Sequence, residues 1–195
     1  MLFINHNMDS LSFYTAIEPG WLNGYIPSFA LVGVQLVFMG VYREGGRRAV
    51  DVSWYSPRDK LAAAINTLLQ VAMLLLSVFV PFKLAIAWFY VGVGIYVVAV
   101  LGFVAAFYAY CRAPLGKAIT GGIYKMSRNP QYACFTLGMV GVCVASASLW
   151  MALLLVPFAI ATHLVVLGEE RYCARAYGDG YAEYKRRVPR YFLFL

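Results

Sequence analysis

Two polar motifs in the second half of the chain contain residue types that bind cationic ligands. Residues 121–132 read GGIYKMSRNPQY, and the acidic pair Glu169 and Glu170 follows about forty residues later. Tyrosine rings attract sulfonium and quaternary ammonium groups, and carboxylates attract the same positive charges. The residue before a proline is biased away from helix, so residues 128–130 are expected to form a corner that offers side chains and free backbone N–H groups. Together the motifs predict a site for a cationic or polyhydroxylated ligand.

The stretch that joins the two motifs predicts how they are brought together. No Lys, Arg, Asp or Glu occurs between Arg128 and Glu169, and a charge at the centre of a bilayer costs at least ~2.5–3.5 kcal/mol. About 20 residues span the hydrocarbon core, so the run is long enough for two crossings, with a turn at the Ser-Ala-Ser of residues 146–148. Two antiparallel helices would therefore hold both motifs at one face of the membrane.

The composition predicts a membrane location for the whole chain. Hydrophobic residues make up 62% of it and charged residues 13%, whereas soluble domains carry about 25% charged residues. We expect an all-α integral membrane protein with five transmembrane helices, forming a single membrane domain over residues 1–195. The expected spans cover residues 25–42, 61–80, 84–108, 133–146 and 149–167.

Positive charge is distributed unevenly between the two ends of these spans. Of the 16 Lys and Arg residues, 15 fall in residues 43–60, 111–128 and 169–195, and only Lys83 lies in a connection on the other side. By the positive-inside rule the basic side is cytoplasmic, so the N-terminus is expected outside, and the C-terminus and both motifs at the cytoplasmic face. The net charge of +7 then reflects topology and attraction to anionic lipid headgroups, and it does not indicate nucleic-acid binding.

The acidic pair admits two interpretations on physical grounds. Glu169 and Glu170 come at the C-terminal end of a predicted span, where the helix dipole disfavours negative charge. Either they are solvated or paired with Arg128, Arg171 or Arg175, or they hold a cationic ligand at the membrane boundary.

Polar residues inside the spans could likewise serve either a ligand or the packing of the helices. Asn66, Gln70 and Ser77 share one face of the second span and either line a substrate channel or form interhelical hydrogen bonds, which are worth ~0.6–2 kcal/mol each and are the commoner case. His163 lies on nearly the same helix face as Glu170, and we expect it to bond a neighbouring helix as a neutral side chain rather than to relay protons or bind metal. The four cysteines form no CxxC pair and no Cys/His cluster, so no metal site is expected.

Neither of two glycine patterns inside the predicted spans is expected to carry chemistry. Residues 91–94 read VGVG, but they lie inside an apolar span without the strand and the acidic residue of a dinucleotide-binding fold. Gly138, Gly141 and Ala145 form a stripe of small residues, which lets two helices approach closely.

The two motifs match a known pattern when they are taken together. The sequence G-I-Y-x-x-S-R-N-P-x-Y, followed after an apolar hairpin by E-E and then by Y-G-D-G-Y-x-E-Y-K-R-R-V-P, resembles the integral-membrane methyltransferases. That superfamily contains the isoprenylcysteine carboxyl methyltransferases and the phospholipid N-methyltransferases. The resemblance covers residues 112–192, and residues 1–110 match only as hydrophobic spans.

The resemblance implies an enzyme that binds S-adenosylmethionine at the cytoplasmic end of the last two spans, in a bacterial or archaeal inner membrane or in the endoplasmic reticulum. Residues 1–110 would supply spans one to three, and residues 111–195 the catalytic region. The residues that the resemblance assigns to the cofactor are Gly116, Lys117, Ala118, Ile119, Tyr124, Asn129, Pro130, Gln131, Tyr132 and Glu169.

The resemblance also bears on the methyl acceptor, which it implies to be a lipid or a lipid-modified molecule. The isoprenylcysteine branch has His at the position of Asn129 and Arg at the position of Val165, whereas the phospholipid branch shows Asn-Pro-x-Tyr. The C-terminal signature is closer to the isoprenylcysteine branch, but the two departures favour a phospholipid amine over a carboxylate. For an amine, Glu170 is the nearest candidate base; for a carboxylate, Arg128 is the best available cation.

Two further hypotheses remain open. Sterol-reductase-type membrane enzymes share an R-x-P-x-Y corner and use NADPH. Alternatively the chain is a non-catalytic scaffold, and the tyrosines of its tail, Tyr177, Tyr181 and Tyr184, lie on the membrane interface as anchors rather than forming a lid.

Overall fold

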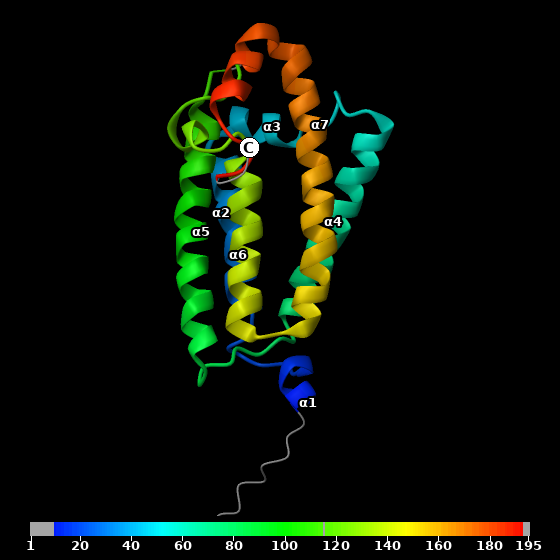
Figure 1. The fold of residues 1–195 in the computed structure, drawn as a ribbon, viewed down its shortest axis with the longest axis vertical. Coiled ribbons are helices and arrows are strands. Elements are labelled where there is room, and N and C mark those ends of the chain that lie inside the picture. The colour runs from blue at the N-terminus through cyan, green and yellow to red at the C-terminus, as the bar shows by residue number, and fades with distance from the viewer. Residues whose placement is uncertain (1–9, 115, 193–195) are drawn as a thin grey trace, which may run out of the picture.

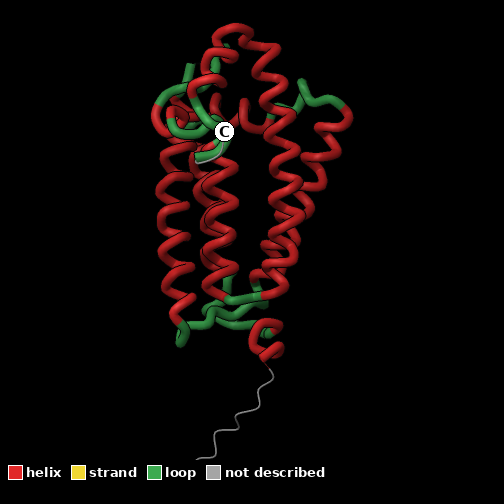
Figure 2. The backbone as a smooth tube through the Cα atoms, viewed as in Figure 1, coloured by secondary structure: helices red, strands yellow, loops and turns green. Residues whose placement is uncertain are grey.

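The computed structural model describes residues 10–114 and 116–192, and in this part of the chain it contains helices and no strand (Figures 1 and 2). The expected all-helical class is confirmed. The ends of the predicted 1–195 domain, residues 1–9 and 193–195, lie outside the described residues, as does residue 115. The helices are α1 (Ser10–Thr15), α2 (Tyr25–Val41), α3 (Arg43–Val50), α4 (Pro57–Ser77), α5 (Ala87–Arg112), the 3-10 helix η1 (Gly122–Lys125), α6 (Pro130–Ser146) and α7 (Leu149–Arg187).

Three of the described helices, α4, α5 and α7, are long and apolar enough to cross a membrane. The two shorter apolar helices, α2 and α6, run beside them along the long axis of the molecule (Figure 1). Most side chains on the outer faces of α4 and α5 are exposed and apolar, as expected where a hydrocarbon solvent replaces water.

The predicted turn between the last two long helices is present. Helix α6 ends at Ser146, Ala147 adopts a left-handed conformation with φ 47°, and α7 begins at Leu149. The hydroxyl of Ser148 accepts a hydrogen bond from the backbone N–H of Met151, which caps the first turn of α7. The turn brings the two ends that carry the polar motifs to the same end of the bundle.

Although α6 and α7 are joined by a turn, they are not each other's main packing partners. The most extensive contacts join α5 to α6 and α4 to α7, rather than α6 to α7. A Cβ on Gly92 would lie 2.4 Å from the backbone nitrogen of Ala145 and 2.5 Å from the carbonyl oxygen of Gly141. The expected packing role of the small-residue stripe of α6 is thus confirmed: Gly141 and Ala145 lie against Gly92 of α5, and a Cβ on Gly138 would meet Leu31 of α2.

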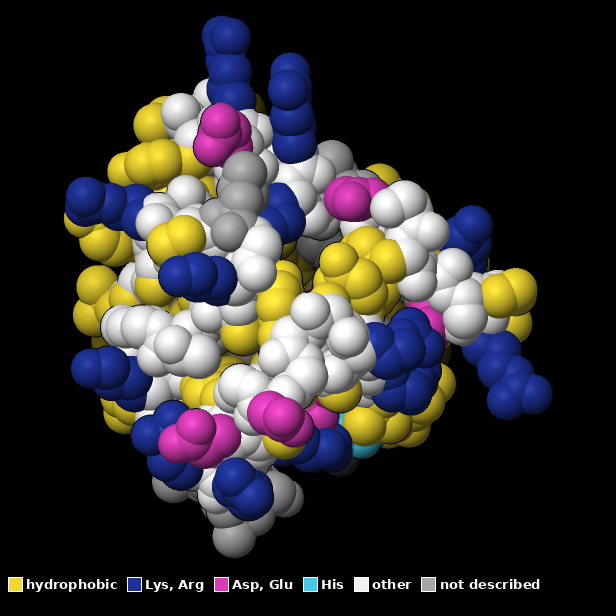
Figure 3. Space-filling view, turned by 90° about the horizontal axis from the view of Figure 1, so that it is seen from above, with side chains coloured by type: hydrophobic (Ala, Val, Ile, Leu, Met, Phe, Trp, Pro, Cys, Tyr) yellow, Lys and Arg dark blue, Asp and Glu magenta, His cyan; other side chains and the backbone are white. Residues whose placement is uncertain are grey.

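The basic segments meet at one end of the bundle, which we call the upper end because Figure 1 draws it there. Figure 3 looks down on this end and shows Lys and Arg side chains distributed over it. The loop that contains Lys83 lies at the opposite end, beside the exposed Trp21 and Trp88 at the starts of α2 and α5.

Helix α7 extends well beyond the apolar segment predicted for it. It continues to Arg187 and is interrupted at Gly178, whose φ of 53° and ψ of −131° are not helical. Glycine permits this backbone conformation, which lets the chain turn back over the upper end (Figure 1). The predicted interfacial anchor is therefore wrong for Tyr181 and Tyr184, because both side chains are buried beneath this turn.

Candidate functional site

A cavity of about 910 Å³, partly open to solvent, lies at the upper end of the bundle. We call it the cap cavity, because α3, the segment before η1, the start of α6 and the upper part of α7 enclose it. Ten of the twelve residues predicted for the site line it: Lys117, Ala118, Ile119, Tyr124, Arg128, Asn129, Gln131, Tyr132, Glu169 and Glu170. The other two do not: Gly116 is exposed, with φ 74°, and Pro130 is buried in the first turn of α6.

A second cavity of about 710 Å³ lies below it, among the long helices. This bundle cavity is lined by amide and hydroxyl groups and by phenyl rings, from Gln35, Asn66, Gln70, Thr136, Thr162, Phe103, Phe107, Phe135 and Phe158. The two cavities share five lining residues, Ala49, Tyr110, Gln131, Tyr132 and Glu169. These five mark the junction between the solvent-facing cavity and the one inside the bundle.

Of the three polar residues of α4, one forms the expected interhelical hydrogen bond and two line a cavity. Asn66 accepts a hydrogen bond of 2.7 Å from the hydroxyl of Thr162 on α7, which is an interhelical bond. Asn66 and Gln70 also line the bundle cavity. Ser77 does neither, because its hydroxyl donates to the carbonyl of Leu74 in its own helix.

Glu169 lies at the junction of the cavities, and its hydrogen-bond partners among the described residues are two tyrosine hydroxyls. Its Oε1 accepts from the hydroxyl of Tyr132 and, at 3.5 Å, from that of Tyr55. Burial, with the nearby carboxylate, raises the pKa of Tyr55, so this side chain stays a neutral donor. No Lys or Arg of the described residues forms an ion pair with Glu169.

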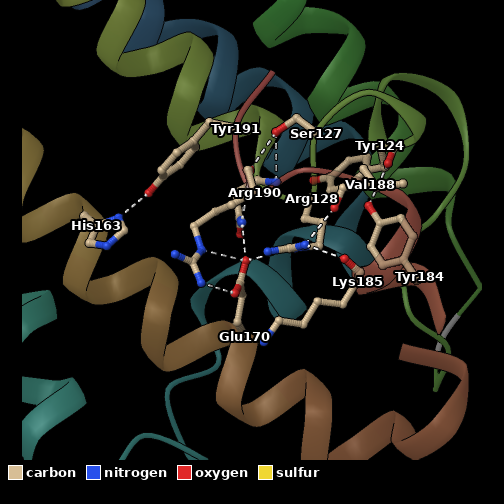
Figure 4. Close-up of polar contacts among 11 residues, drawn as sticks. Tyr124, Ser127, Arg128, His163, Glu170, Tyr184, Lys185, Val188, Arg190 and Tyr191 are labelled. Atoms are coloured by element: carbon tan, nitrogen blue, oxygen red, sulfur yellow. Dashed lines mark hydrogen bonds and ion pairs between the residues drawn. The ribbon is translucent and has the colours of Figure 1, made fainter. Parts of the chain in front are cut away.

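Glu170, the adjacent residue, is paired on both of its oxygens (Figure 4). Its Oε1 accepts from Arg128 at 3.1 Å, Asn129 at 3.0 Å and Arg190 at 3.2 Å, and its Oε2 accepts from Arg190 at 2.9 Å. The side chains of Arg128 and Glu170 are each only 6% exposed. The hydrogen bonds of the carboxylate raise the pKa of Arg190 above its usual value, since they stabilise the charged form.

Arg128 also ties the chain's C-terminal tail to the start of α6. Its backbone N–H donates to the carbonyl of Pro189 at 2.9 Å, and its guanidinium donates to the carbonyls of Lys185 and Val188. The hydroxyl of Ser127 donates to the carbonyl of Arg190 at 3.0 Å. The Arg-Asn-Pro corner is thus held in place by the tail. The guanidinium of Arg128, which the sequence suggested as the cation for a carboxylate substrate, already binds Glu170 and two backbone carbonyls.

Aromatic side chains form the rest of the cap cavity wall. The hydroxyl of Tyr184 donates to the carbonyl of Tyr124 at 2.7 Å, which fixes the returning part of α7 over η1. Trp54, from the loop after α3, stacks on Tyr172 of α7 with ring centroids 4.2 Å apart. This tyrosine- and tryptophan-rich wall suits a positively charged or planar ligand.

His163 takes a partner other than the one expected. Its Nδ1 lies 3.0 Å from the hydroxyl of Tyr191, which belongs to the tail and not to a neighbouring helix (Figure 4). Burial raises the pKa of Tyr191 to about 12, so its hydroxyl stays protonated. Among the described residues no three His, Cys, Asp or Glu side chains come together as a metal-binding group.

Sequence reasoning missed the side of the site that comes from the first half of the chain. Arg48, Trp54 and Tyr55 precede α4, and Tyr110 lies near the end of α5, yet all four line the cap cavity. The available signal was the predicted topology, which places residues 43–60 at the same face as both motifs. It did not specify which of those side chains would point inward.

Two buried donors of the site have no hydrogen-bond partner among the described residues. They are Nε of Arg48 and Nε2 of Gln131, and both side chains line the cap cavity. Buried donors are nearly always paired in folded proteins, so an unpaired donor beside a cavity is where an acceptor atom of a ligand fits.

Comparison with known proteins identifies a family and two relatives for part of the chain. The family model described as phospholipid methyltransferase matches residues 80–180. The chain is 37% identical over 75 residues to the cobalt-zinc-cadmium resistance protein CzcN of Cupriavidus metallidurans, which covers 38% of this chain and 34% of that protein. It is 32% identical over 77 residues to the nickel-cobalt-cadmium resistance protein NccN of Alcaligenes xylosoxydans xylosoxydans, with 39% and 36% covered. The chain therefore aligns with about a third of the length of each of these relatives, and no solved structure matches it significantly.

Proposed function

Because the chain belongs to the phospholipid methyltransferase family, we propose that it is an S-adenosylmethionine-dependent methyltransferase that acts on a lipidic acceptor at the membrane interface. The observation that carries the proposal is the position of Glu169, a carboxylate without a cationic partner among the described residues, at the junction of two cavities. A methyltransferase needs such a junction, where the group to be transferred meets its acceptor.

The cap cavity is the proposed cofactor site. When bound there, S-adenosylmethionine supplies an electrophilic methyl group. Glu169, with the rings of Tyr124 and Tyr132, would hold the positive charge of the cofactor. Residues 117–119 would supply backbone contacts to it, and the Asn129–Gln131 corner would bind its polar parts. The unpaired Nε2 of Gln131 supports this fit, because a ligand with nitrogen or oxygen acceptors would give that donor a partner.

The bundle cavity is the proposed place of the acceptor. Its amides and hydroxyls suit a polar head, its phenyl rings suit the apolar part of an amphiphile, and its upper end reaches Glu169. The chain's contribution is then to position the two reactants. A lipid amine is favoured over a carboxylate, because the uncompensated charge at the junction is negative and Arg128 already pairs with Glu170.

The two residues that sequence reasoning placed in catalysis are better explained as positioning residues. Glu170 accepts hydrogen bonds from two arginines and one asparagine, which leaves it poorly suited to take a proton from an amine. We propose that Glu170 and Arg128 fix the corner and the tail around the cofactor. Glu169 is then the carboxylate that meets the ligand.

The membrane topology that fits this site is the one expected from the sequence. We propose five crossings within a single domain, since α2 and α6, each of 17 residues, are about 25 Å long and lie beside the three longer helices. The basic upper end would face the cytoplasm, where S-adenosylmethionine is available. The names of the two curated relatives describe metal resistance of those proteins and specify no reaction, so they favour neither acceptor.

Ligand binding to the detergent-purified protein tests the proposal against its alternatives. We expect S-adenosylmethionine and S-adenosylhomocysteine to bind by calorimetry and to raise the thermal unfolding temperature, and NADPH to do neither. Stabilisation by NADPH alone would revive the reductase hypothesis. Indifference to all three ligands would favour a non-catalytic scaffold.

A further inference from the structure

Arg48 is a half-buried cation that lines the cap cavity, and the proposed function assigns it no role. It lies on α3, its guanidinium covers the ring of Tyr110 at 4.2 Å from the centroid, and Nη2 donates to the carbonyl of the same residue. Its Nε is buried without a partner among the described residues. The side chain is therefore held in place by Tyr110, while its Nε–H has no acceptor among the described residues.

The charge of Arg48 is also uncompensated. It forms no ion pair with any described carboxylate, and the acidic residue nearest in sequence that lines the same cavity, Asp51, is exposed and accepts from the backbone of Ser53. Taking a cation out of water without an opposite charge is unfavourable. An arginine so placed beside a cavity is suited to bind an anionic oxygen of a ligand.

The other cations of the cavity differ from Arg48 in this respect. Arg128 is paired with Glu170, and Lys117 is exposed on the segment before η1. Arg48 and Glu169 are thus a cation and an anion that line one cavity and pair neither with each other nor with another charged side chain of the described chain. A zwitterion is complementary to such an arrangement.

We infer that Arg48 is the anion-binding residue of the cap cavity and that it receives a carboxylate, that of the amino-acid part of the cofactor, while Glu169 meets the positive charge. The inference rests on the proposed function, and it adds a residue that lies outside the stretch matched by the family model, residues 80–180. A phosphate of the acceptor lipid offers the same anionic chemistry, and the experiment below separates the two sources.

The test compares two ligands on matched variants. Arg48→Met removes the charge and keeps an unbranched side chain, Arg48→Lys keeps the charge, and Arg47→Met removes the same charge from the exposed neighbour on α3. Each protein is titrated with S-adenosylmethionine and with its decarboxylated analogue, and its thermal unfolding is recorded without ligand to show that it folds.

We expect Arg48→Met to weaken S-adenosylmethionine binding about 10- to 100-fold, the range of a lost charge-assisted hydrogen bond. Binding of the decarboxylated analogue should change less than about threefold, Arg48→Lys should restore part of the loss, and Arg47→Met should bind as the wild type does. Equal weakening of both ligands would overturn the inference, because Arg48 would then act through packing alone.

Three other outcomes lead to different conclusions. Unchanged cofactor binding with a raised KM for phospholipid would keep Arg48 as the anion site and assign the anion to the acceptor. Unchanged cofactor binding and unchanged KM would overturn the inference and leave the proposed function intact. Absence of any adenosyl-ligand binding to the wild type would overturn the proposed function and the inference with it.

Discussion

Glu169 and Glu170 are neighbours in sequence but differ in what surrounds them. The first has two tyrosine hydroxyls as partners and reaches both cavities, whereas the second is enclosed by two arginines and an asparagine. Because successive residues of a helix point about 100° apart, one carboxylate faces the junction and the other faces the tail. Two identical side chains thereby acquire different roles.

This difference gives the prediction at the residue scale. Glu169→Gln keeps the volume of the side chain and its contact with Tyr132 but removes the charge, so we expect S-adenosylmethionine binding to weaken at least about tenfold and methyl transfer to fall about 10²-fold or more. Thermal unfolding without ligand should be nearly unchanged. Calorimetry and a transfer assay on the same preparation measure both.

Glu170→Gln is the matched comparison. It leaves Arg128 and Arg190 without their buried partner, and breaking a buried ion pair costs about 3–5 kcal/mol, so its unfolding temperature should fall clearly. The assignment would be contradicted if Glu169→Gln bound the cofactor normally, or if it destabilised the protein as much as Glu170→Gln.

Sequence reasoning found about half of the residues that line the cap cavity, but not which side chains they contact. Of the ten predicted residues that line the cap cavity, seven lie in residues 121–132 and 169–170, and the family resemblance added Lys117, Ala118 and Ile119. Arg48 and Tyr55 were missed because their roles depend on tertiary contacts with Tyr110 and Glu169, more than 60 and 110 residues away. The partner of Glu170 in the tail, Arg190, was missed for the same reason.

At the scale of elements, the contact between α5 and α6 positions the start of α6. Gly92 and Gly141 let the two backbones approach so closely that an added Cβ on either would lie within 3 Å of the other helix. Since α6 begins with the Asn129–Pro130 corner, a shift of this helix would move the site.

Substitution of two glycines on α5 tests this role. Gly92→Ala would force its methyl against backbone atoms that cannot rotate away, and we expect destabilisation of about 1–3 kcal/mol or more with a loss of cofactor affinity. Gly94→Ala is the control, because a Cβ there meets nothing within 4 Å. Thermal unfolding of the two variants in the same detergent makes the comparison, and equal stability would contradict the packing account.

The small-residue stripe was predictable from α6 alone, but its partner was not, since several spans carry glycine. The end of α7 was not predictable either. A Tyr-Gly-Asp-Gly sequence indicates a break, yet the helix resumes after Gly178 because Tyr181 and Tyr184 gain burial against the segment before η1.

At the scale of the whole molecule, charge distribution relates the fold to the membrane. The upper end carries the basic side chains (Figure 3) and the cap cavity, and the lower end carries Lys83 and exposed tryptophans. The membrane class of the protein, and the position of both motifs at the same end of the bundle, could be predicted from the sequence, because they depend on the hydropathy and charge along the chain. The second cavity did not, because it depends on how five apolar helices pack.

Labelling of introduced cysteines tests the proposed orientation. In a cysteine-free background and sealed right-side-out vesicles, a membrane-impermeant maleimide should label Lys83→Cys and leave Arg47→Cys unlabelled until the membrane is opened. The reverse pattern would place the cap cavity outside the cell and contradict the proposed orientation.

Methyl transfer itself is the most direct test of the account. Purified protein is incubated with S-adenosylmethionine that carries a labelled methyl group and with a total lipid extract, and the products are separated, with Glu169→Gln as the background. We predict label in methylated derivatives of phosphatidylethanolamine, lost in the variant. Equal label in wild type and variant, or none in any lipid while the wild type binds the cofactor, would contradict a lipid methyltransferase centred on Glu169.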